Sequence, residues 1–233
     1  MCGRYTITVS YEELVLRFLL RRGTSELYAP RYNVAPGQWI PAVVDGTNGD
    51  GGITHGSRFG SLQWGLVPSW ASGDKSGPRP INLRSETLAD KPGFRKLLSR
   101  KRCLIPADGF YEWYQADGKK KPVRFTLRDH SLFGMAAVYD TWSGADGNKL
   151  HTCAIITVPA NETMAHIHHR MPAILTAEQE SIWLDRTVTE PERLLPLLAP
   201  YTAKPTTIYR VSTKVGHAAY DAPDCIDSIE DRD

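Results

Sequence analysis

The chain has 233 residues, 41% of them hydrophobic and 23% charged, and its formal net charge is +2. This length and hydrophobic content allow one domain with a proper core, and the mildly basic balance does not by itself indicate a nucleic-acid partner, although a local basic groove is compatible with it. No apolar run approaches the roughly 20 residues that span a bilayer, and the polar N-terminal segment lacks a signal-peptide core, so we expect a cytoplasmic protein without membrane contact.

The first predicted helix follows Ser10, which has Glu13 three residues later. This spacing is a capping box, and apolar residues then recur at helical spacing, which predicts a helix from about residue 11. Thr176 and Gln179 form a second box at the start of another predicted helix. That helix is predicted within residues 177–185, and the other two within residues 92–102 and 190–198, the last of them broken near Pro196.

Strand signals are more numerous than helix signals, and they crowd the middle of the chain. Asp117-Gly118 lies between two such runs and predicts a hairpin turn. Because the helices are scattered and do not alternate with the strands, we predict an α+β domain around a mostly antiparallel sheet or barrel. Strands are predicted over residues 103–114, 122–127, 132–142, 151–158, 171–175 and 207–212.

No internal repeat or linker divides the chain. A single domain is therefore expected over residues 1–233, with a core of about 2–226 and a short acidic, solvated tail at 227–233. The Gly-rich stretch at 45–58 lacks the GKS or GKT ending of a phosphate loop, and no helix pattern follows it, which predicts a surface loop.

Cys2 differs from the other cysteines. None of the four is in CxxC spacing, and Cys103 and Cys153 lie in apolar strand-like runs where cysteine behaves as a small buried hydrophobe, whereas Cys2 lies outside any such run. If Met1 is removed, Cys2 carries a free α-amine and a thiol on adjacent carbons, a pair that condenses with aldehydes to a thiazolidine ring. The alternatives are chance and amide hydrolysis, with the amine as base for the thiol.

Glu112 stands between Tyr111 and Trp113 in a predicted strand, where alternation puts it on one face with Phe110 and Tyr114. A glutamate on an apolar face can have a raised pKa and transfer protons. The alternative is an edge-strand glutamate that faces water, and this segment taken alone favours that alternative.

Three histidines, His166, His168 and His169, precede a predicted strand. Such a tract can bind a metal, but no cysteine or carboxylate lies close in sequence to complete the ligand set, and we expect no metal. Of the three interpretations, an acid–base role for one histidine is favoured most, surface histidines without a catalytic role come second, and a metal site is favoured least.

Asn82 and Arg84 are two residues apart, so their side chains point to the same side of an extended segment, and Arg31 and Asn33 repeat the pattern. An arginine beside an amide suits a phosphate oxygen or a carboxylate. Each pair alone is a weak signal, because arginine and asparagine are common on protein surfaces.

Two tryptophans, Trp64 and Trp70, flank Val67-Pro68. Tryptophans in such a loop are more often plugs of the core, but they also serve as platforms for unpaired bases. Lysines and arginines are spread through the same half of the chain, which would suit a nucleic-acid partner.

Six segments, taken together and in order, resemble the SRAP family, the SOS response-associated peptidases or abasic-site-processing proteins. They are MCGRY, RYNVAP, WGLVPSW, INLRSET, RCLIPADGFYEW and HHRMPAIL, and the resemblance extends to about residue 226. It implies an α+β domain with a curved β core, a positively charged channel for single-stranded DNA, no cofactor, and covalent capture of abasic sites.

Carried over residue by residue, the resemblance implies that Cys2 is the nucleophile after loss of Met1. Asn82 would position the terminal amine and the opened sugar, and Glu112 would be the acid–base residue at the Schiff base and in reversal. His168 would assist opening of the deoxyribose ring. The implied DNA contacts are Arg4, Asn33, Trp70, Arg84 and Arg170.

Two departures from the family pattern stand out. The chain has Trp70-Ala71 where some relatives have tandem tryptophans, and Val215-Gly216-His217 where many have an asparagine after the valine. The leading hypothesis is a monomeric sensor that crosslinks itself to abasic sites in single-stranded DNA. The alternatives are a thiol peptidase or amidase that uses Cys2, including one that only matures its own N-terminus, and a non-covalent binder of single-stranded DNA.

Overall fold

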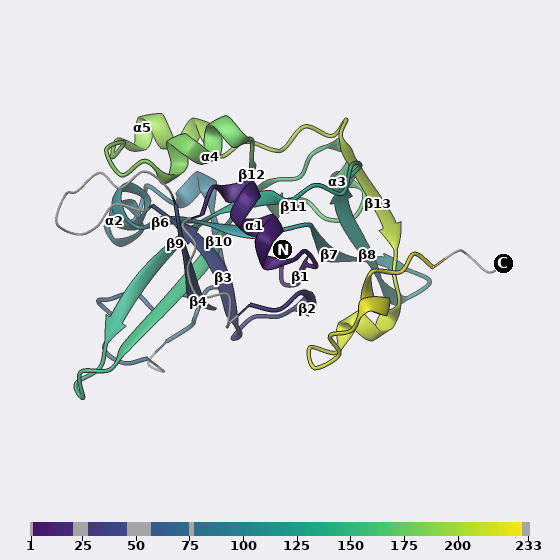
Figure 1. Cartoon of the computed structure of the whole chain (residues 1–233), viewed down its shortest axis with the longest axis horizontal. Coiled ribbons are helices and arrows are strands. Elements are labelled where there is room, and N and C mark those ends of the chain that lie inside the picture. Colours follow the sequence, from purple (N-terminus) through teal and green to yellow (C-terminus); the bar gives the residue numbers. More distant parts are fainter. Residues whose placement is uncertain (1, 21–27, 46–56, 75–76, 230–233) are drawn as a thin grey trace.

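The computed structural model of the chain describes residues 2–20, 28–45, 57–74 and 77–229 (Figure 1). The strands in this part are β1 (Tyr5–Ile7), β2 (Arg31–Val34), β3 (Trp39–Val44), β4 (Arg58–Trp64), β5 (Asn82–Arg84), β6 (Arg102–Ala107), β7 (Gly109–Ala116), β8 (Lys119–Leu127), β9 (Phe133–Ser143), β10 (Lys149–Pro159), β11 (Arg170–Pro172), β12 (Ile174–Leu175) and β13 (Thr206–Arg210). The α-helices are α1 (Tyr11–Phe18), α2 (Pro92–Arg100), α3 (Glu162–Ala165), α4 (Ala177–Leu184) and α5 (Pro191–Leu194). Short 3₁₀ helices are η2 (Ser85–Thr87), η3 (Leu195–Leu197), η4 (Thr213–Gly216) and η5 (Pro223–Ile226).

Strands β3, β4, β6, β9 and β10 close into a barrel. Neighbours in the order β4-β3-β6-β9-β10 are antiparallel, and β10 then runs parallel to β4. An odd number of strands cannot alternate in direction all the way round a ring, so closure requires one parallel pair. Strands β5 and β11 pair with β10, and β12 pairs with β9. The predicted α+β fold with a barrel-like, mostly antiparallel core is therefore confirmed.

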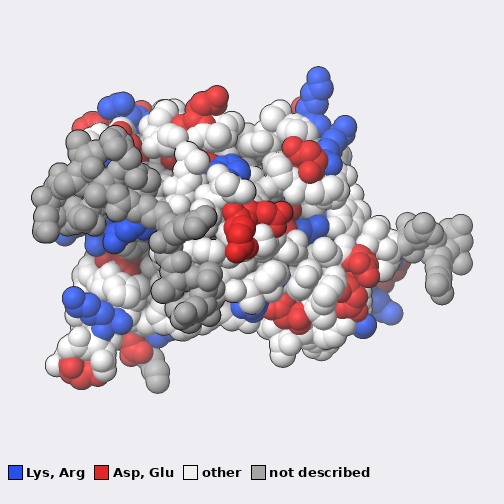
Figure 2. Space-filling view, in the orientation of Figure 1, with Lys and Arg blue, Asp and Glu red and all other residues white. Residues whose placement is uncertain are grey.

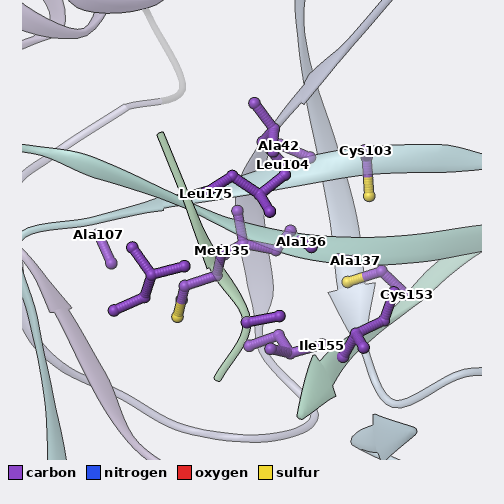
Figure 3. Close-up of a cluster of buried hydrophobic side chains, with 14 of the residues drawn as sticks. Ala42, Cys103, Leu104, Ala107, Met135, Ala136, Ala137, Cys153, Ile155 and Leu175 are labelled. Atoms are coloured by element: carbon purple, nitrogen blue, oxygen red, sulfur yellow. The ribbon is translucent and has the colours of Figure 1, made fainter. Parts of the chain in front are cut away.

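The barrel interior is filled by small and medium apolar side chains from facing strands (Figure 3). Leu104, Met135 and Ile155 are fully buried there, together with the thiols of Cys103 and Cys153. Burial raises the pKa of both thiols above the ordinary cysteine range. These two cysteines are small buried hydrophobic residues, as their sequence context predicts.

A second sheet, antiparallel throughout, has the strand order β13-β8-β7-β1-β2. Strands β7 and β8 form a hairpin whose turn residues, Asp117 and Gly118, have φ angles of +51° and +71°. Positive φ at both central residues is the geometry of a type I′ turn, which favours Asp-Gly. The predicted hairpin is confirmed.

The strand predicted over residues 103–114 is two strands, and the sequence prediction is wrong on this point. Strand β6 ends in the barrel and β7 begins in the second sheet, on either side of Asp108. The Asp108 carboxylate is buried and accepts hydrogen bonds from Thr6, Thr8 and Arg124. At the point where the chain changes sheets, this side chain thus bonds to both β1 and β8.

Both predicted capping boxes are present. The hydroxyl of Ser10 accepts the Glu13 N–H at 3.2 Å, and the Glu13 carboxylate accepts the Ser10 N–H at 2.7 Å, at the start of α1. Thr176 and Gln179 form the same reciprocal pair at the start of α4, at 3.3 and 2.9 Å. The other two predicted helices correspond to α2 and to α5 followed by η3.

Three sequence predictions concern residues outside the described part of the chain. These are Met1, most of the predicted Gly-rich surface loop (46–56) and the end of the acidic tail (230–233). Within the described residues, every helix is too short or too polar to cross a bilayer.

Arg102, at the start of β6, joins the C-terminal ends of two helices. Its side chain is buried, and burial lowers its pKa to about 10. The guanidinium donates to two carbonyls at the end of α2 and two at the end of α4, at 2.5–2.8 Å: those of Leu98, Ser99, Trp183 and Asp185. The last carbonyls of a helix lack intrahelical partners, so one arginine satisfies both helix ends.

We expect Arg102→Met to lower the free energy of unfolding by about 2–3 kcal/mol. Methionine keeps the packing of the arginine stem but leaves these four carbonyls without their shared donor. Urea-induced unfolding measures the change, with Arg193→Met as the control, because the Arg193 side chain is 63% exposed. Equal stability of the two variants would contradict the role given to Arg102.

Candidate functional site

Cys2 lies shortly before β1, which begins at Tyr5, and is fully buried, although no apolar sequence surrounds it. Strand β1 pairs with β7 so that Tyr5 is opposite Phe110, and the Tyr111 N–H donates to the Arg4 carbonyl at 2.9 Å. The same register, continued by one residue, sets Gly3 against Glu112. The pairing of β1 with β7 thus places the first residues of the chain beside the strand that carries Glu112, the predicted acid–base residue.

Asn82 reaches Cys2 from the barrel side. It lies on β5, which pairs with β10, and its Nδ2 donates to the Cys2 carbonyl at 2.8 Å. Its Oδ1 is also buried and accepts no hydrogen bond from the described residues. The family motifs predicted that these two residues act together, and the fold brings them into contact across 80 positions of sequence.

Glu112 is only 5% exposed, so the solvent-facing alternative is wrong. It lies on β7, between β1 and β8 in the interior of the second sheet rather than at its edge. Burial, and secondarily the Glu112 charge, raise the pKa of the Cys2 thiol to about 12. The two groups are therefore close enough to interact electrostatically, and the Cys2 thiol is protonated at neutral pH.

A pocket of about 500 Å³ opens beside Glu112. This volume lies within the range of about 300–1,000 Å³ that is usual for ligand sites. His168, which precedes β11, forms part of its wall together with the β7–β8 hairpin and η4. The lining residues are Glu112, Trp113, Lys120, Pro122, His168, Thr213 and Gly216.

The His168 ring is oriented by the backbone of Arg170. The Arg170 N–H donates to His168 Nδ1 at 3.0 Å, so the neutral ring carries its proton on Nε2. The Arg170 carbonyl lies 3.2 Å from the same nitrogen and can accept its proton when the ring is charged. The same backbone segment can thus hold the ring in either protonation state.

His169 stacks on His168, with 4.4 Å between ring centroids. The positive charge of His168 is the main cause that lowers the pKa of the exposed His169. Among the described residues, no group of three or more His, Cys, Asp or Glu side chains is arranged to hold a metal ion.

The predicted DNA contacts fall into two groups. Arg84, on β5 two residues after Asn82, is exposed. Arg4, by contrast, donates to Asn33 Oδ1 at 3.0 Å and to the Val215 carbonyl at 2.6 Å. The fully buried Asn33 amide also donates to the carbonyls of residues 215, 217 and 220, so both side chains hold the C-terminal segment.

The side chains of two other predicted DNA contacts, Arg170 and Trp70, do not line the pocket, and both contact other protein groups. The Arg170 side chain is 8% exposed and forms an ion pair with Glu86. Trp70 is 54% exposed and packs on Phe94 of α2, with 6.3 Å between ring centroids. Helix α2 and strand β7 lie well apart in Figure 1.

Glu86, Lys120 and the Asp108–Arg124 pair were not predicted from the sequence. The positions of Glu86 and Lys120 could have indicated a place near the site. Glu86 follows Arg84 in INLRSET, and Lys120 follows the predicted hairpin turn. On the face in Figure 2, acidic and basic side chains are interspersed, and neither sign forms a continuous band.

Comparisons with known proteins agree on one group of relatives. A family model described as SOS response associated peptidase (SRAP) matches residues 1–218. The chain is 44% identical to abasic site processing protein YoqW of Bacillus subtilis, over 98% of this chain and all of that one. It is 33% identical to abasic site processing protein HMCES of Gallus gallus, over 87% of this chain and 67% of that one.

The fold also matches solved structures. The crystal structure of a protein from Bacteroides thetaiotaomicron superposes with a TM-score of 0.81 at 25% identity, covering 91% of this chain and 93% of that one. A second, from Bordetella bronchiseptica, gives a TM-score of 0.75 at 23% identity, over 91% and 100% of the two chains, a likeness of fold alone.

Proposed function

Because the chain belongs to the SRAP family, we propose that it captures abasic sites in single-stranded DNA through Cys2, after Met1 has been removed. The product is a covalent thiazolidine crosslink that shields the lesion. Two relatives named for abasic site processing, both matched over their whole length, support this substrate class.

The observation that carries the proposal is the hydrogen bond from Asn82 to the Cys2 carbonyl, beside Glu112. Once Met1 is gone, the α-amine and the thiol belong to one residue, and this bond anchors the main chain that bears both. The buried Asn82 Oδ1 is available to accept a hydrogen bond from the new amine.

The chemistry follows from the open form of an abasic sugar, which is an aldehyde. The neutral amine of Cys2 adds to the aldehyde carbon, and the adduct takes up one proton from an acid and loses one water, which gives a protonated imine. The thiol sulfur then adds to the same carbon, the C=N electron pair moves to nitrogen, and the thiol proton leaves to a base. One water is lost overall, and a five-membered ring closes.

An order in which the amine attacks first is consistent with the state of the thiol. Burial raises the pKa of the Cys2 thiol in the chain that still carries Met1, and a protonated thiol needs an acceptor for its proton when the ring closes. Glu112 is that acceptor, and it returns a proton when the crosslink reverses. His168, in the wall of the same pocket, assists opening of the sugar ring.

Contacts to the DNA backbone suit a lesion that has no base to be read. Arg84 is the best placed of the proposed phosphate contacts, because it is exposed and two residues from Asn82. Arg4, Asn33 and Trp70 complete the proposed set, whereas Arg170, which the resemblance also implies, is already paired with Glu86.

The alternative that the family description favours is a thiol peptidase. Such an enzyme needs a Cys2 thiolate and donors for an oxyanion. A thiol whose pKa is raised to about 12 is a poor source of thiolate at neutral pH, which favours the aldehyde reaction.

The test uses a single-stranded oligonucleotide with one abasic site. We expect a shifted band that survives heating on a denaturing gel, with an intact mass equal to the protein without Met1 plus the oligonucleotide less one water. A matched oligonucleotide with a tetrahydrofuran analogue, which has no aldehyde, should give no band. A protein that keeps an N-terminal extension should also give none.

Two results would contradict the proposal. One is an equal covalent yield with the tetrahydrofuran oligonucleotide or with the extended protein. The other is binding that salt reverses completely, without covalent product, which would identify a non-covalent binder. Cys2-dependent cleavage of an unrelated peptide, without any crosslink, would instead support the peptidase.

A further inference from the structure

Glu86 and Arg170 form a bidentate ion pair beside the site. One nitrogen of the guanidinium donates to Glu86 Oε1, and the other donates to Oε2 at 2.9 Å. The Arg170 side chain is 8% exposed, whereas that of Glu86 is 47% exposed. Two parallel hydrogen bonds fix the relative orientation of both side chains, as a single contact would not.

This ion pair joins two strands that carry different parts of the site. Glu86 lies in η2, directly after β5 with Asn82, and Arg170 begins β11, directly after His168 and His169. Both strands pair with β10 and meet at Thr157, which is opposite Arg84 on one side and Pro172 on the other. The Arg170 guanidinium also donates to the Thr157 carbonyl at 2.5 Å.

The backbone of Arg170 in turn orients His168, because its N–H donates to His168 Nδ1 at 3.0 Å. A shift of the Arg170 main chain would therefore rotate or release the imidazole. Both terminal nitrogens of the Arg170 side chain already have protein acceptors, which suits support of the site better than a contact to phosphate.

We infer that Glu86 is a positioning residue: its ion pair with Arg170 fixes the backbone that orients His168, and ties it to the strand that holds Cys2 through Asn82. The catalytic consequence rests on the proposed function. Glu86 itself does not touch the reacting atoms.

Glu86 keeps its charge throughout the useful pH range. The hydrogen bonds from Arg170 lower the pKa of its carboxyl to about 2. A depressed pKa means that the interaction is complete above the ordinary value near 4.5 and is lost only as pH falls toward 2. Any change in a pH profile near neutrality must then arise from other groups.

Several titratable or charged groups surround His168. His169 stacks on the ring, and Arg170 contacts it through the backbone. Glu112 on β7 and Lys120 on β8 line the same pocket. A displaced imidazole would change its distance from each of these groups, so the chemical shifts of its ring should change.

The test is Glu86→Gln, with Glu192→Gln as the matched control, because Glu192 is 76% exposed on α5 in a loose pair with Arg95 at 3.8 Å. With saturating abasic oligonucleotide, we expect crosslinking by Glu86→Gln to slow by about tenfold or more, since misplacement of about 1 Å can cost up to about 100-fold. The pH profile should shift, and affinity for the tetrahydrofuran oligonucleotide should change by less than about threefold. Glu86→Asp, which keeps the charge, should recover part of the rate.

NMR spectra of the His168 ring in the DNA-free protein separate the two proposals. Changed ring chemical shifts or a changed tautomer in Glu86→Gln support the positioning role even if wild-type protein forms no crosslink, a result that would reject the proposed function alone. Wild-type rates and an unchanged imidazole in Glu86→Gln would overturn the inference. The inference would also be overturned if Glu86→Gln altered DNA affinity but left the rate at saturating DNA unchanged. In that case Arg170 would be a phosphate ligand, and Glu86 would only compete with the phosphate for it.

Discussion

Cys2→Ala is expected to abolish the heat-stable adduct with an abasic oligonucleotide, reducing it to the level of the tetrahydrofuran control. Alanine leaves the α-amine in place after Met1 removal, so condensation with the aldehyde still gives an imine. Without a thiol no ring closes, and the imine hydrolyses on heating. A denaturing gel of heated samples measures the loss.

Borohydride separates the two halves of this reaction. It reduces the C=N bond to an amine, so it should trap a covalent product in Cys2→Ala if the amine acts first. Cys225→Ala is the matched control, because Cys225 is also buried but lies in a separate cluster with Tyr111 and Val215. Persistence of a heat-stable adduct in Cys2→Ala, or its loss in Cys225→Ala, would count against Cys2 as the nucleophile.

Local signals in the sequence predicted local structure well. A capping box or an Asp-Gly turn is a short-range interaction, since all of its atoms lie within about four residues. The boxes that begin at Ser10 and Thr176 and the turn at Asp117 are therefore readable from the sequence and are present.

Features that depend on distant partners were not predictable in this way. Strands β2, β3 and β4 were not predicted; β3 and β4 are held by closure of the barrel and β2 by β1. The burial of Glu112 could not be predicted from its own segment for the same reason, because it depends on elements distant in sequence that pack around β7.

The candidate site shows the same division. The family motifs identified Asn82 and His168 without revealing how they are held. The Asn82–Cys2 bond spans 80 residues and the Glu86–Arg170 pair spans 84, and no local pattern encodes either. The buried position of Cys2 was also unexpected, because its burial comes from the elements packed around β1 rather than from its neighbours in sequence.

Strand β1, which follows Cys2 in the chain, is anchored by a buried ion pair. Asp108 and Arg124 are 6% and 5% exposed at their side chains and lie 3.0 Å apart. Asp108 Oδ1 also accepts the Thr6 hydroxyl at 2.5 Å, and Oδ2 accepts the Thr8 N–H at 2.9 Å. Since Thr6 belongs to β1 and Arg124 to β8, these contacts fix β1 within the second sheet.

Asp108→Asn should therefore destabilise the fold more than Arg102→Met does, by about 3–5 kcal/mol. Asparagine has the right shape, but either orientation of its amide turns an NH₂ group toward a donor, and the Arg124 charge is left buried without its counter-ion. Urea-induced unfolding measures the loss, and a loss of this size is a large fraction of the roughly 5–15 kcal/mol that stabilises most domains.

The matched control for Asp108→Asn is Asp117→Asn, which removes the exposed ion pair with Lys121 at the tip of the β7–β8 hairpin and should leave stability essentially unchanged. Adding Arg124→Met to Asp108→Asn should restore part of the stability, because it removes the uncompensated charge. If the double variant were less stable than Asp108→Asn by the full effect of a second independent mutation, the two residues would not be coupled. Strand β1 would then be held by its backbone hydrogen bonds alone, and the position of Cys2 beside Glu112 would not depend on the Asp108–Arg124 pair.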